Sequence, residues 1–162
     1  MSLVTEYPAA SSKVAAEHFL RRLSVETDCA DVAHSQASGE ADFVLLHVVG
    51  SSQTFACRHL PGAVHLPHHE MTEDRMAEWP KETLFVVYCA GPHCNGADQA
   101  ALKLARLGRP VKIMIGGITG WQDEGVRLRL LDGRRRRGRL RCRKGKSRSD
   151  RFSGRTSRRR SR

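Results

Sequence analysis

Long hydrophobic runs are missing from this sequence of 162 residues. No stretch approaches the ~18 consecutive apolar residues that a membrane-spanning helix needs, so we predict no membrane contact. Residues 1–10 also lack the basic segment and apolar core of a secretory signal, so we expect no export. The sequence therefore predicts a cytoplasmic protein.

Cysteines are few and follow no disulfide pattern. The chain holds 5, an odd number, at positions 29, 57, 89, 94 and 142. They do not form the dense framework of a small secreted domain, and thiols in a cytoplasm stay reduced. In that setting an isolated cysteine on a loop is a candidate nucleophile.

Acidic residues are scarce at one end of the chain only. From residue 127 to the C-terminus there are 16 Arg and 2 Lys against Asp132 and Asp150, whereas residues 1–126 hold 10 basic and 15 acidic side chains. The first part is typical of a mildly acidic domain. The second part is a basic, low-complexity tail with few large apolar residues, which we predict to be disordered.

Three interpretations of this tail, residues 127–162, stay open. Its arginines could contact the phosphates of a nucleic acid, or it could be a basic sorting signal. An Arg/Gly/Ser-rich run that abruptly replaces a domain boundary is also what GC-rich DNA encodes in a shifted reading frame. The tail lacks the interleaved aromatic residues that stack on bases, so we favour a tail without a specific role.

Short apolar runs alternate with helical patterns between residues 11 and 125. Runs bounded by turn residues predict buried strands at 43–49, 63–66, 84–88 and 111–115. Apolar spacing and capping residues predict helices over 15–23, 28–37, 72–80 and 97–107, and around residue 121. The segment at 51–58 is predicted as a loop. The alternation predicts an α/β fold, a small parallel sheet with helices on both faces.

We divide the chain into three parts on these patterns. Residues 1–39 are predicted to be an N-terminal helical segment, residues 40–126 the α/β domain, and residues 127–162 the tail.

Cys89 directly follows the predicted strand 84–88 and begins a loop that runs to Gly96. In a parallel α/β sheet, ligands bind outside the carboxyl ends of the strands. The free amides and positive dipole end of the helix at 97–107 should lower the pKa of Cys89. The glycines of the loop let several amides converge on one anion. This geometry suits a thiolate that attacks a sulfur atom and holds it as a persulfide.

Three segments resemble motifs of the rhodanese family. Strand 84–88 with Cys89, Gly91 and the following helix looks like the family's active-site element. Residues 58–63, RHLPGA, are similar to its G-H-[IL]-P-G-A segment, and residues 116–125, GGITGWQDEG, to its closing G-G-x-x-x-W-x-x-x-G. The motifs stand in family order and cover roughly residues 40–126, which implies a rhodanese-like domain.

The resemblance implies that Cys89 takes sulfur from a donor such as thiosulfate and passes it to a thiophilic acceptor, cyanide or another thiol. We expect the amides of residues 90–95 to surround the persulfide, without a cofactor. The predicted substrate-binding loop consists of Ala90, Gly91, Pro92, His93, Cys94, Asn95 and Gly96.

Cys94 lies five residues beyond Cys89 in the same loop. It is a possible resolving thiol that forms a disulfide with Cys89 or receives its sulfur. The alternative is a second loop thiol with a packing role. Cys29 and Cys57 are expected to be structural.

Two departures from the family pattern favour a different role. Where family members usually carry an Asp-x-Arg pair at the end of the first strand, this sequence has His47 and Val49. The loop holds neither Arg nor Lys, and its one possible cation is His93, which should weaken the binding of an anionic donor. The alternative is therefore a non-catalytic rhodanese module with a regulatory or partner-binding role.

Two rival site chemistries fit the residues poorly. His65, His68 and His69 lie close in the sequence, but their spacing matches no established site, so we predict no metal. A cysteine phosphatase or arsenate reductase shares the loop-plus-helix design but needs an arginine that closes the loop, and here Asn95 or Gly96 takes that place.

Overall fold

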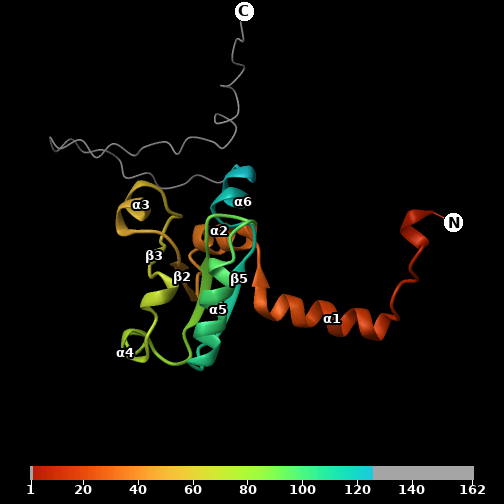
Figure 1. Ribbon diagram of the computed structural model, residues 1–162, viewed down its shortest axis with the longest axis horizontal. Coiled ribbons are helices and arrows are strands. Elements are labelled where there is room, and N and C mark those ends of the chain that lie inside the picture. The colour runs from red at the N-terminus through yellow and green to blue at the C-terminus, as the bar shows by residue number, and fades with distance from the viewer. Residues whose placement is uncertain (1, 126–162) are drawn as a thin grey trace, which may run out of the picture. The chain divides into compact units, whose positions relative to one another are not determined.

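The computed structural model describes residues 2–125, which form a parallel five-stranded sheet with helices on both faces (Figure 1). The sheet runs in the order β1-β5-β4-β2-β3, and each neighbouring pair is parallel. This confirms the predicted α/β fold class. The tail, residues 127–162, whose disorder was predicted, lies outside the described residues, as does Cys142. The strands are β1 (Glu26–Thr27), β2 (Phe43–His47), β3 (Val64–His65), β4 (Leu84–Tyr88) and β5 (Val111–Met114).

Helices connect the strands and begin at polar caps. The Ser11 hydroxyl accepts the amide of Val14 at the start of α1, and the Asp28 carboxylate accepts the amide of Asp31 at the start of α2. The helices are α1 (Ser12–Val25), α2 (Cys29–Ser38), α3 (Ser52–Cys57), α4 (Glu73–Met76), α5 (Gly96–Arg106) and α6 (Gly117–Asp123), with 3-10 turns η1 (Leu3–Thr5) and η2 (His68–Glu70).

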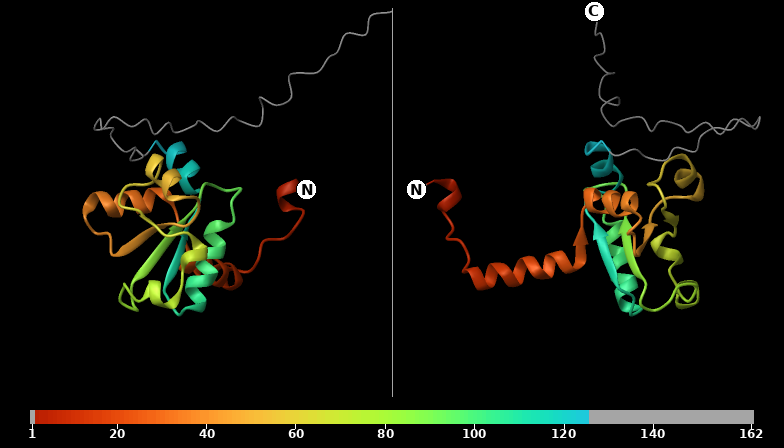
Figure 2. Two further views of the ribbon diagram at one scale, coloured as in Figure 1. Left: turned by 60° about the vertical axis from the view of Figure 1, so that its left-hand side comes forward. Right: turned by 180° about the vertical axis from the view of Figure 1, so that it is seen from behind.

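The side chains of β4 alternate between two apolar cores. Phe85 and Val87 belong to the core that α5 covers, where Ala100 and Leu104 are fully buried. Val86 and Tyr88 belong to a second core, with side chains from α2 and α6. Figure 2 shows α5 on one face of the sheet and α2 on the other, in its left-hand view. This alternation decides which face the residue after β4 joins.

Two elements differ from the sequence prediction. Strand β1 was not predicted, because a two-residue edge strand is too short to show a periodic pattern. The segment predicted as a loop at 51–58 contains α3, whose first turn is capped by the Ser51 hydroxyl through the amide of Thr54. A helix of six residues is likewise too short for helical periodicity to reveal.

Other boundaries shift by a few residues. Strand β2 ends at His47 rather than at residue 49, and α4 ends at Met76 rather than near Pro80. Strand β1 and helix α2, both within residues 1–39, take part in the sheet and in the second core. The division of the chain at residues 39 and 126 stays a prediction.

Within residues 2–125, none of the helices combines the length and apolarity that crossing a membrane requires. Helix α1 keeps its side chains exposed or partly exposed, and it is tied to β5 where Lys112 Nζ donates to the Leu23 carbonyl over 2.9 Å.

Candidate functional site

Cys89 lies one residue beyond β4, at the carboxyl end of the sheet, and residues 90–95 link it to α5. Because side chains alternate along the strand, Cys89 follows Phe85 and Val87 into the core beneath α5. The residue is only 4% exposed. The candidate nucleophile is thus both at the predicted edge of the sheet and inside an apolar core.

Helix α6 fixes the first turn of the loop. The Ile118 amide donates to the Cys89 carbonyl over 3.1 Å, and the amide and hydroxyl of Thr119 donate to the Ala90 carbonyl over 3.1 and 3.0 Å. A Cβ at Gly117 would overlap the Cys89 carbonyl, so glycine is required there. The closing GG motif of the sequence therefore holds the loop, a role that the motif alone did not reveal.

Four backbone amides of the loop and helix face its two sulfur atoms. The amides of Gly91 and Ala97 face the Cys89 sulfur, and those of Ala90 and Gly96 face the Cys94 sulfur. Two of these come from the first turn of α5, as expected for unsatisfied amides at a helix start. The sequence analysis expected amides both from residues 90–95 and from the start of the helix, and the structure places two of each around the sulfurs.

Burial raises the pKa of Cys89 above its ordinary value, by more than the amides of Gly91 and Ala97 lower it. As a thiol, Cys89 also donates to the Cys94 carbonyl over 3.1 Å, a contact that favours the protonated form. The prediction of a lowered pKa for Cys89 is therefore wrong. The helix start is where the sequence placed it, but the apolar core under α5 outweighs it.

Cys94 has the opposite balance. Partial burial raises its pKa, but the amides of Gly96 and Ala90 and the neighbouring Cys89 thiol outweigh burial and lower the pKa below the usual thiol value. Cys94 is more exposed than Cys89, so it loses less hydration as a thiolate. Of the two hydrogen-bonded thiols, Cys94 ionises first and Cys89 keeps its proton.

An open pocket of about 580 Å³ lies beside the loop, lined by Pro92, His93, Cys94, Asn95 and Asp98. Its lining within residues 2–125 includes neither Lys nor Arg, and Asp98 contributes a carboxylate. A donor that enters here meets Cys94, which lines the pocket, whereas Cys89 is buried and is not among the lining residues.

His47 and Val49, which replace the family's usual charged pair, lie apart in the structure. Val49 packs against the loop, so closely that a Cβ on Gly96 would overlap its Cγ1. His47 lies in the opposite direction, 2% exposed and stacked on Tyr88 with ring centroids 4.9 Å apart. Burial lowers the pKa of His47 to about 4, so the ring is neutral at pH 7. Neither residue offers a charge to the loop.

The remaining histidine candidates are scattered. The ring of His65 stacks on Phe55, and its Nε2 lies 3.2 Å from the Gly50 carbonyl. His68 and His69 follow on η2 with ring centroids 6.0 Å apart. Among the described residues, no three His, Cys, Asp or Glu side chains come together as ligands for a metal ion.

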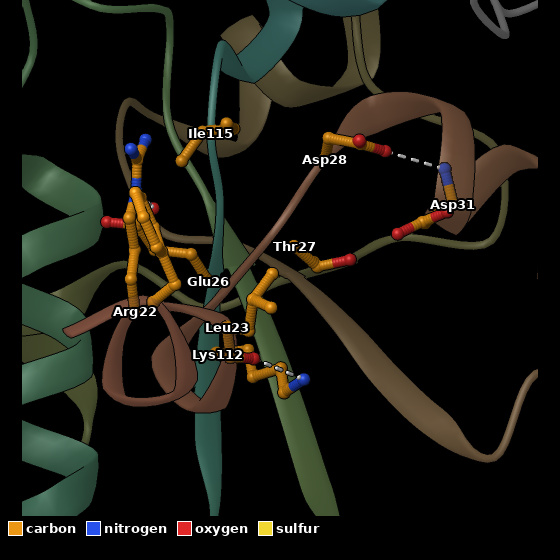
Figure 3. A pocket seen from close by; sticks show the side chains of 9 residues that line it. Arg22, Leu23, Glu26, Thr27, Asp28, Asp31, Lys112 and Ile115 are labelled. Atoms are coloured by element: carbon orange, nitrogen blue, oxygen red, sulfur yellow. Dashed lines mark hydrogen bonds and ion pairs between the residues drawn. The ribbon is translucent and has the colours of Figure 1, made fainter. Parts of the chain in front are cut away.

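A second pocket, of about 500 Å³, lies where α1, β1, α2 and β5 meet (Figure 3). Three of its charged side chains already have partners within the protein. Arg22 Nε forms an ion pair with Glu26 over 2.7 Å, and Lys112 Nζ donates a hydrogen bond to the Leu23 carbonyl. The sequence analysis missed this pocket because its walls come from separate elements. The lining residues are Phe19, Arg22, Leu23, Glu26, Thr27, Asp28, Asp31, Lys112 and Ile115, without a thiol among them.

Three cysteines, Cys29, Cys89 and Cys94, are free thiols, as the sequence predicted, whereas Cys57 is disulfide-bonded and the expectation of a reduced thiol is wrong there. Cys29 is buried beneath α6, where it donates to the carbonyls of Ile115 and Gly117 over 3.4 and 3.7 Å. Burial raises its pKa to about 11. The thiol chemistry of the described residues is therefore concentrated in the loop at the end of β4.

Comparisons with known proteins agree with the fold. A solved structure of the BH2092 protein from Bacillus halodurans is 35% identical, with a TM-score of 0.69, and the match covers 72% of this chain and 85% of that one. A thiosulfate sulfurtransferase from Pseudomonas aeruginosa is 23% identical with a TM-score of 0.55, over 68% of this chain and 21% of that one, and shares the fold.

A curated relative is the HTH-type transcriptional regulator Rv0324 of Mycobacterium tuberculosis, 33% identical over 87 residues. The match covers 54% of this chain and 38% of the regulator, so most of the regulator has no counterpart in it. The sequence model of the rhodanese-like domain matches residues 31–124, which include strands β2 to β5 and the cysteine loop. The chain therefore belongs to the family of rhodanese-like domains.

Proposed function

We propose that this chain is a sulfurtransferase that carries sulfane sulfur as a persulfide on Cys89. The observation that carries the proposal is the pair of amides, from Gly91 and Ala97, that face the Cys89 sulfur at the end of β4. Backbone amides that converge on a sulfur atom stabilise negative charge on a thiolate or on a persulfide. Membership of the rhodanese-like family supports the same chemistry.

The reaction has two steps in this proposal. Cys89 first passes its proton to the hydrogen-bonded Cys94 thiolate. The Cys89 thiolate then attacks the outer sulfur of a thiosulfate-like donor, the donor's S–S bond breaks, and sulfite leaves with the electron pair. A thiophilic acceptor, cyanide or a thiol, then attacks the outer sulfur of the persulfide. The S–S bond breaks again, and Cys89 leaves as a thiolate ready for the next donor.

The pocket beside the loop bears on the choice of donor. The Asp98 carboxylate repels an anion, and the lining offers neither Lys nor Arg to hold one. We therefore expect thiosulfate to be a weakly bound donor with a high KM, and donors of lower charge to be better. We place this activity in the cytoplasm, where the three free thiols stay reduced.

The test compares the wild type with Cys89→Ser and with Cys29→Ser, a matched control that removes a free thiol outside the loop. Each protein receives thiosulfate and cyanide, and thiocyanate is measured by its iron complex. We expect thiocyanate from the wild type and from Cys29→Ser, and none above background from Cys89→Ser. Equal rates from the wild type and Cys89→Ser would refute the proposal.

A second candidate is a non-catalytic module that regulates or binds a partner through the same loop. The raised pKa of Cys89 and the absence of Lys and Arg from the described pocket lining favour it. Mass spectrometry after thiosulfate treatment separates the two candidates. A chain that neither gains sulfur on Cys89 nor forms a Cys89–Cys94 disulfide supports the binding module, and a gain of one sulfur atom on Cys89 supports the transferase.

A further inference from the structure

We propose that Cys94 resolves a persulfide on Cys89, releasing sulfide and closing a Cys89–Cys94 disulfide that a dithiol reductant reopens. The inference rests on the proposed function, because it needs sulfur on Cys89. It adds a second outcome to the chemistry of the loop, the reduction of sulfane sulfur to sulfide.

The loop folds back so that the two thiols meet. The Cys94 amide donates to the Gly91 carbonyl over 3.0 Å, which makes a tight turn, and the Cys89 sulfur lies 3.1 Å from the Cys94 carbonyl oxygen. The two side chains hydrogen-bond to each other. Gly96 lies beside both side chains, since a Cβ there would lie 3.4 Å from Cys94 Sγ and 3.6 Å from Cys89 Cβ.

The two thiols are unequal in a way that suits attack by Cys94. Cys94 lines the open pocket and has its sulfur faced by the amides of Ala90 and Gly96, so it is the first to become a thiolate. The attacking group in thiol–disulfide exchange is the thiolate. Cys89 is buried and holds the sulfur that is attacked.

The step balances without an external oxidant. The Cys94 thiolate attacks the inner sulfur, Sγ of Cys89, and a bond forms between the two cysteine sulfurs. The outer sulfur of the persulfide first takes a proton from solvent. The bond from Sγ to the outer sulfur then breaks, and the outer sulfur leaves as hydrosulfide with that proton and the electron pair. The two cysteine sulfurs are oxidised to a disulfide, and the sulfane sulfur is reduced to sulfide. An external dithiol then reduces the disulfide and restores both thiols.

The leaving group favours attack on the inner sulfur. Attack on the outer sulfur would expel Cys89 as a thiolate, a poor leaving group because burial raises its pKa. Attack on the inner sulfur expels hydrosulfide, the conjugate base of a stronger acid than a cysteine thiol. The loop is therefore built for resolution rather than for moving the persulfide from Cys89 to Cys94.

The test follows sulfur in the reduced full-length protein after thiosulfate treatment without an acceptor. Sulfide is measured in solution, and peptide mapping locates added sulfur and disulfides. We expect the wild type and the control Cys29→Ser to release sulfide and form the Cys89–Cys94 disulfide. We expect Cys94→Ser and Cys94→Ala to release none and to keep one added sulfur on Cys89. A dithiol added afterwards should reopen the Cys89–Cys94 disulfide of the wild type, which a second peptide map detects.

The outcomes separate this inference from the function on which it rests. If the Cys94 variants hold sulfur on Cys89 while the wild type forms no disulfide and releases no sulfide, the resolution step is wrong and the transferase stands. Added sulfur on Cys94 of the wild type also overturns it. If neither the wild type nor the Cys94 variants take up sulfur, both proposals fall. The disulfide map of the wild type does not depend on any variant. It therefore tests the resolution step even if a Cys94 variant fails to fold.

Discussion

Cys89 and His47 lie at the same carboxyl edge of the sheet but on opposite faces, and burial acts on both. Burial raises the pKa of the Cys89 thiol and lowers that of His47, so each group favours its neutral form. The surroundings then differ. Amides of Gly91 and Ala97 face the thiol, whereas the imidazole is packed among the rings of Tyr88, Phe55 and His65. His47 Nδ1 has no hydrogen-bond partner within residues 2–125.

The difference shows what makes a buried titratable group useful. A thiol beside backbone amides can carry charge for the time a reaction needs, because the donors are already in place. A buried imidazole without hydrogen-bond partners contributes packing only, and it lowers the stability of the fold when acid protonates it. The two regions therefore predict separate responses to mutation, one in sulfur transfer and one in stability.

The largest expected effect is the acid sensitivity that His47 gives to the fold. Its folded pKa of about 4 lies below the ordinary 6.5, so its contribution to stability is complete above pH 6.5 and is lost as the pH falls towards 4. Roughly 3 kcal/mol of unfolding free energy depends on this group across that range. Denaturant unfolding of the wild type and His47→Phe at several pH values measures the difference, and parallel curves would contradict it.

On the face of the sheet that α5 covers, where Cys89 lies, one added methyl group should lower the rate of sulfur transfer. A Cβ at Gly96 would overlap Val49 Cγ1 and move the start of α5, whose amides serve both sulfurs. We expect Gly96→Ala to lower thiocyanate formation about 100-fold, the size typical of a misplacement of about 1 Å at a catalytic site. The double variant Val49→Ala/Gly96→Ala removes the overlap and should recover most of the rate. A double variant no better than Gly96→Ala would show that Val49 is not the obstacle.

On the opposite face, where His47 stacks on Tyr88, the loss of one oxygen should lower the stability of the fold. Tyr88 Oη accepts the amide of Leu60, which is fully buried, over 3.1 Å. Tyr88→Phe leaves that amide unsatisfied, and we expect a loss of roughly 1–2 kcal/mol in unfolding free energy with sulfur transfer unchanged. Tyr7→Phe, at a tyrosine that is 79% exposed, is the matched control. A loss of activity in Tyr88→Phe would mean that the two faces are coupled.

The smallest effect concerns the charge in the pocket. Asp98→Asn should raise kcat/KM for thiosulfate about threefold, because the Asp98 carboxylate lines the pocket beside the loop and repels the anionic donor. The gain should vanish at high salt, which screens exposed charges. Asp123→Asn, on α6 and outside the lining of this pocket, controls for net charge. A gain that persists in high salt would point to a steric cause instead.

Local patterns were enough for much of the fold. The strand 84–88 was predicted with its final boundaries, and Asp28 and Gly39 marked the ends of α2, because caps and apolar runs act over a few residues. Strand β1, of two residues, and helix α3, of six, were missed because each spans fewer than two periods of its pattern, too few to recognise. The family and the position of the cysteine loop also followed from contiguous motifs.

The order of proton loss in the loop required the tertiary structure. Cys89 and Cys94 are near neighbours in the sequence, and the start of α5 was placed correctly beside both. What reverses the expected pKa of Cys89 is the core beneath α5, assembled from strands and helices distant along the chain. A sequence by itself determines which groups can ionise, and the residues packed around them decide which one does, because the cost of charge depends on its surroundings in space.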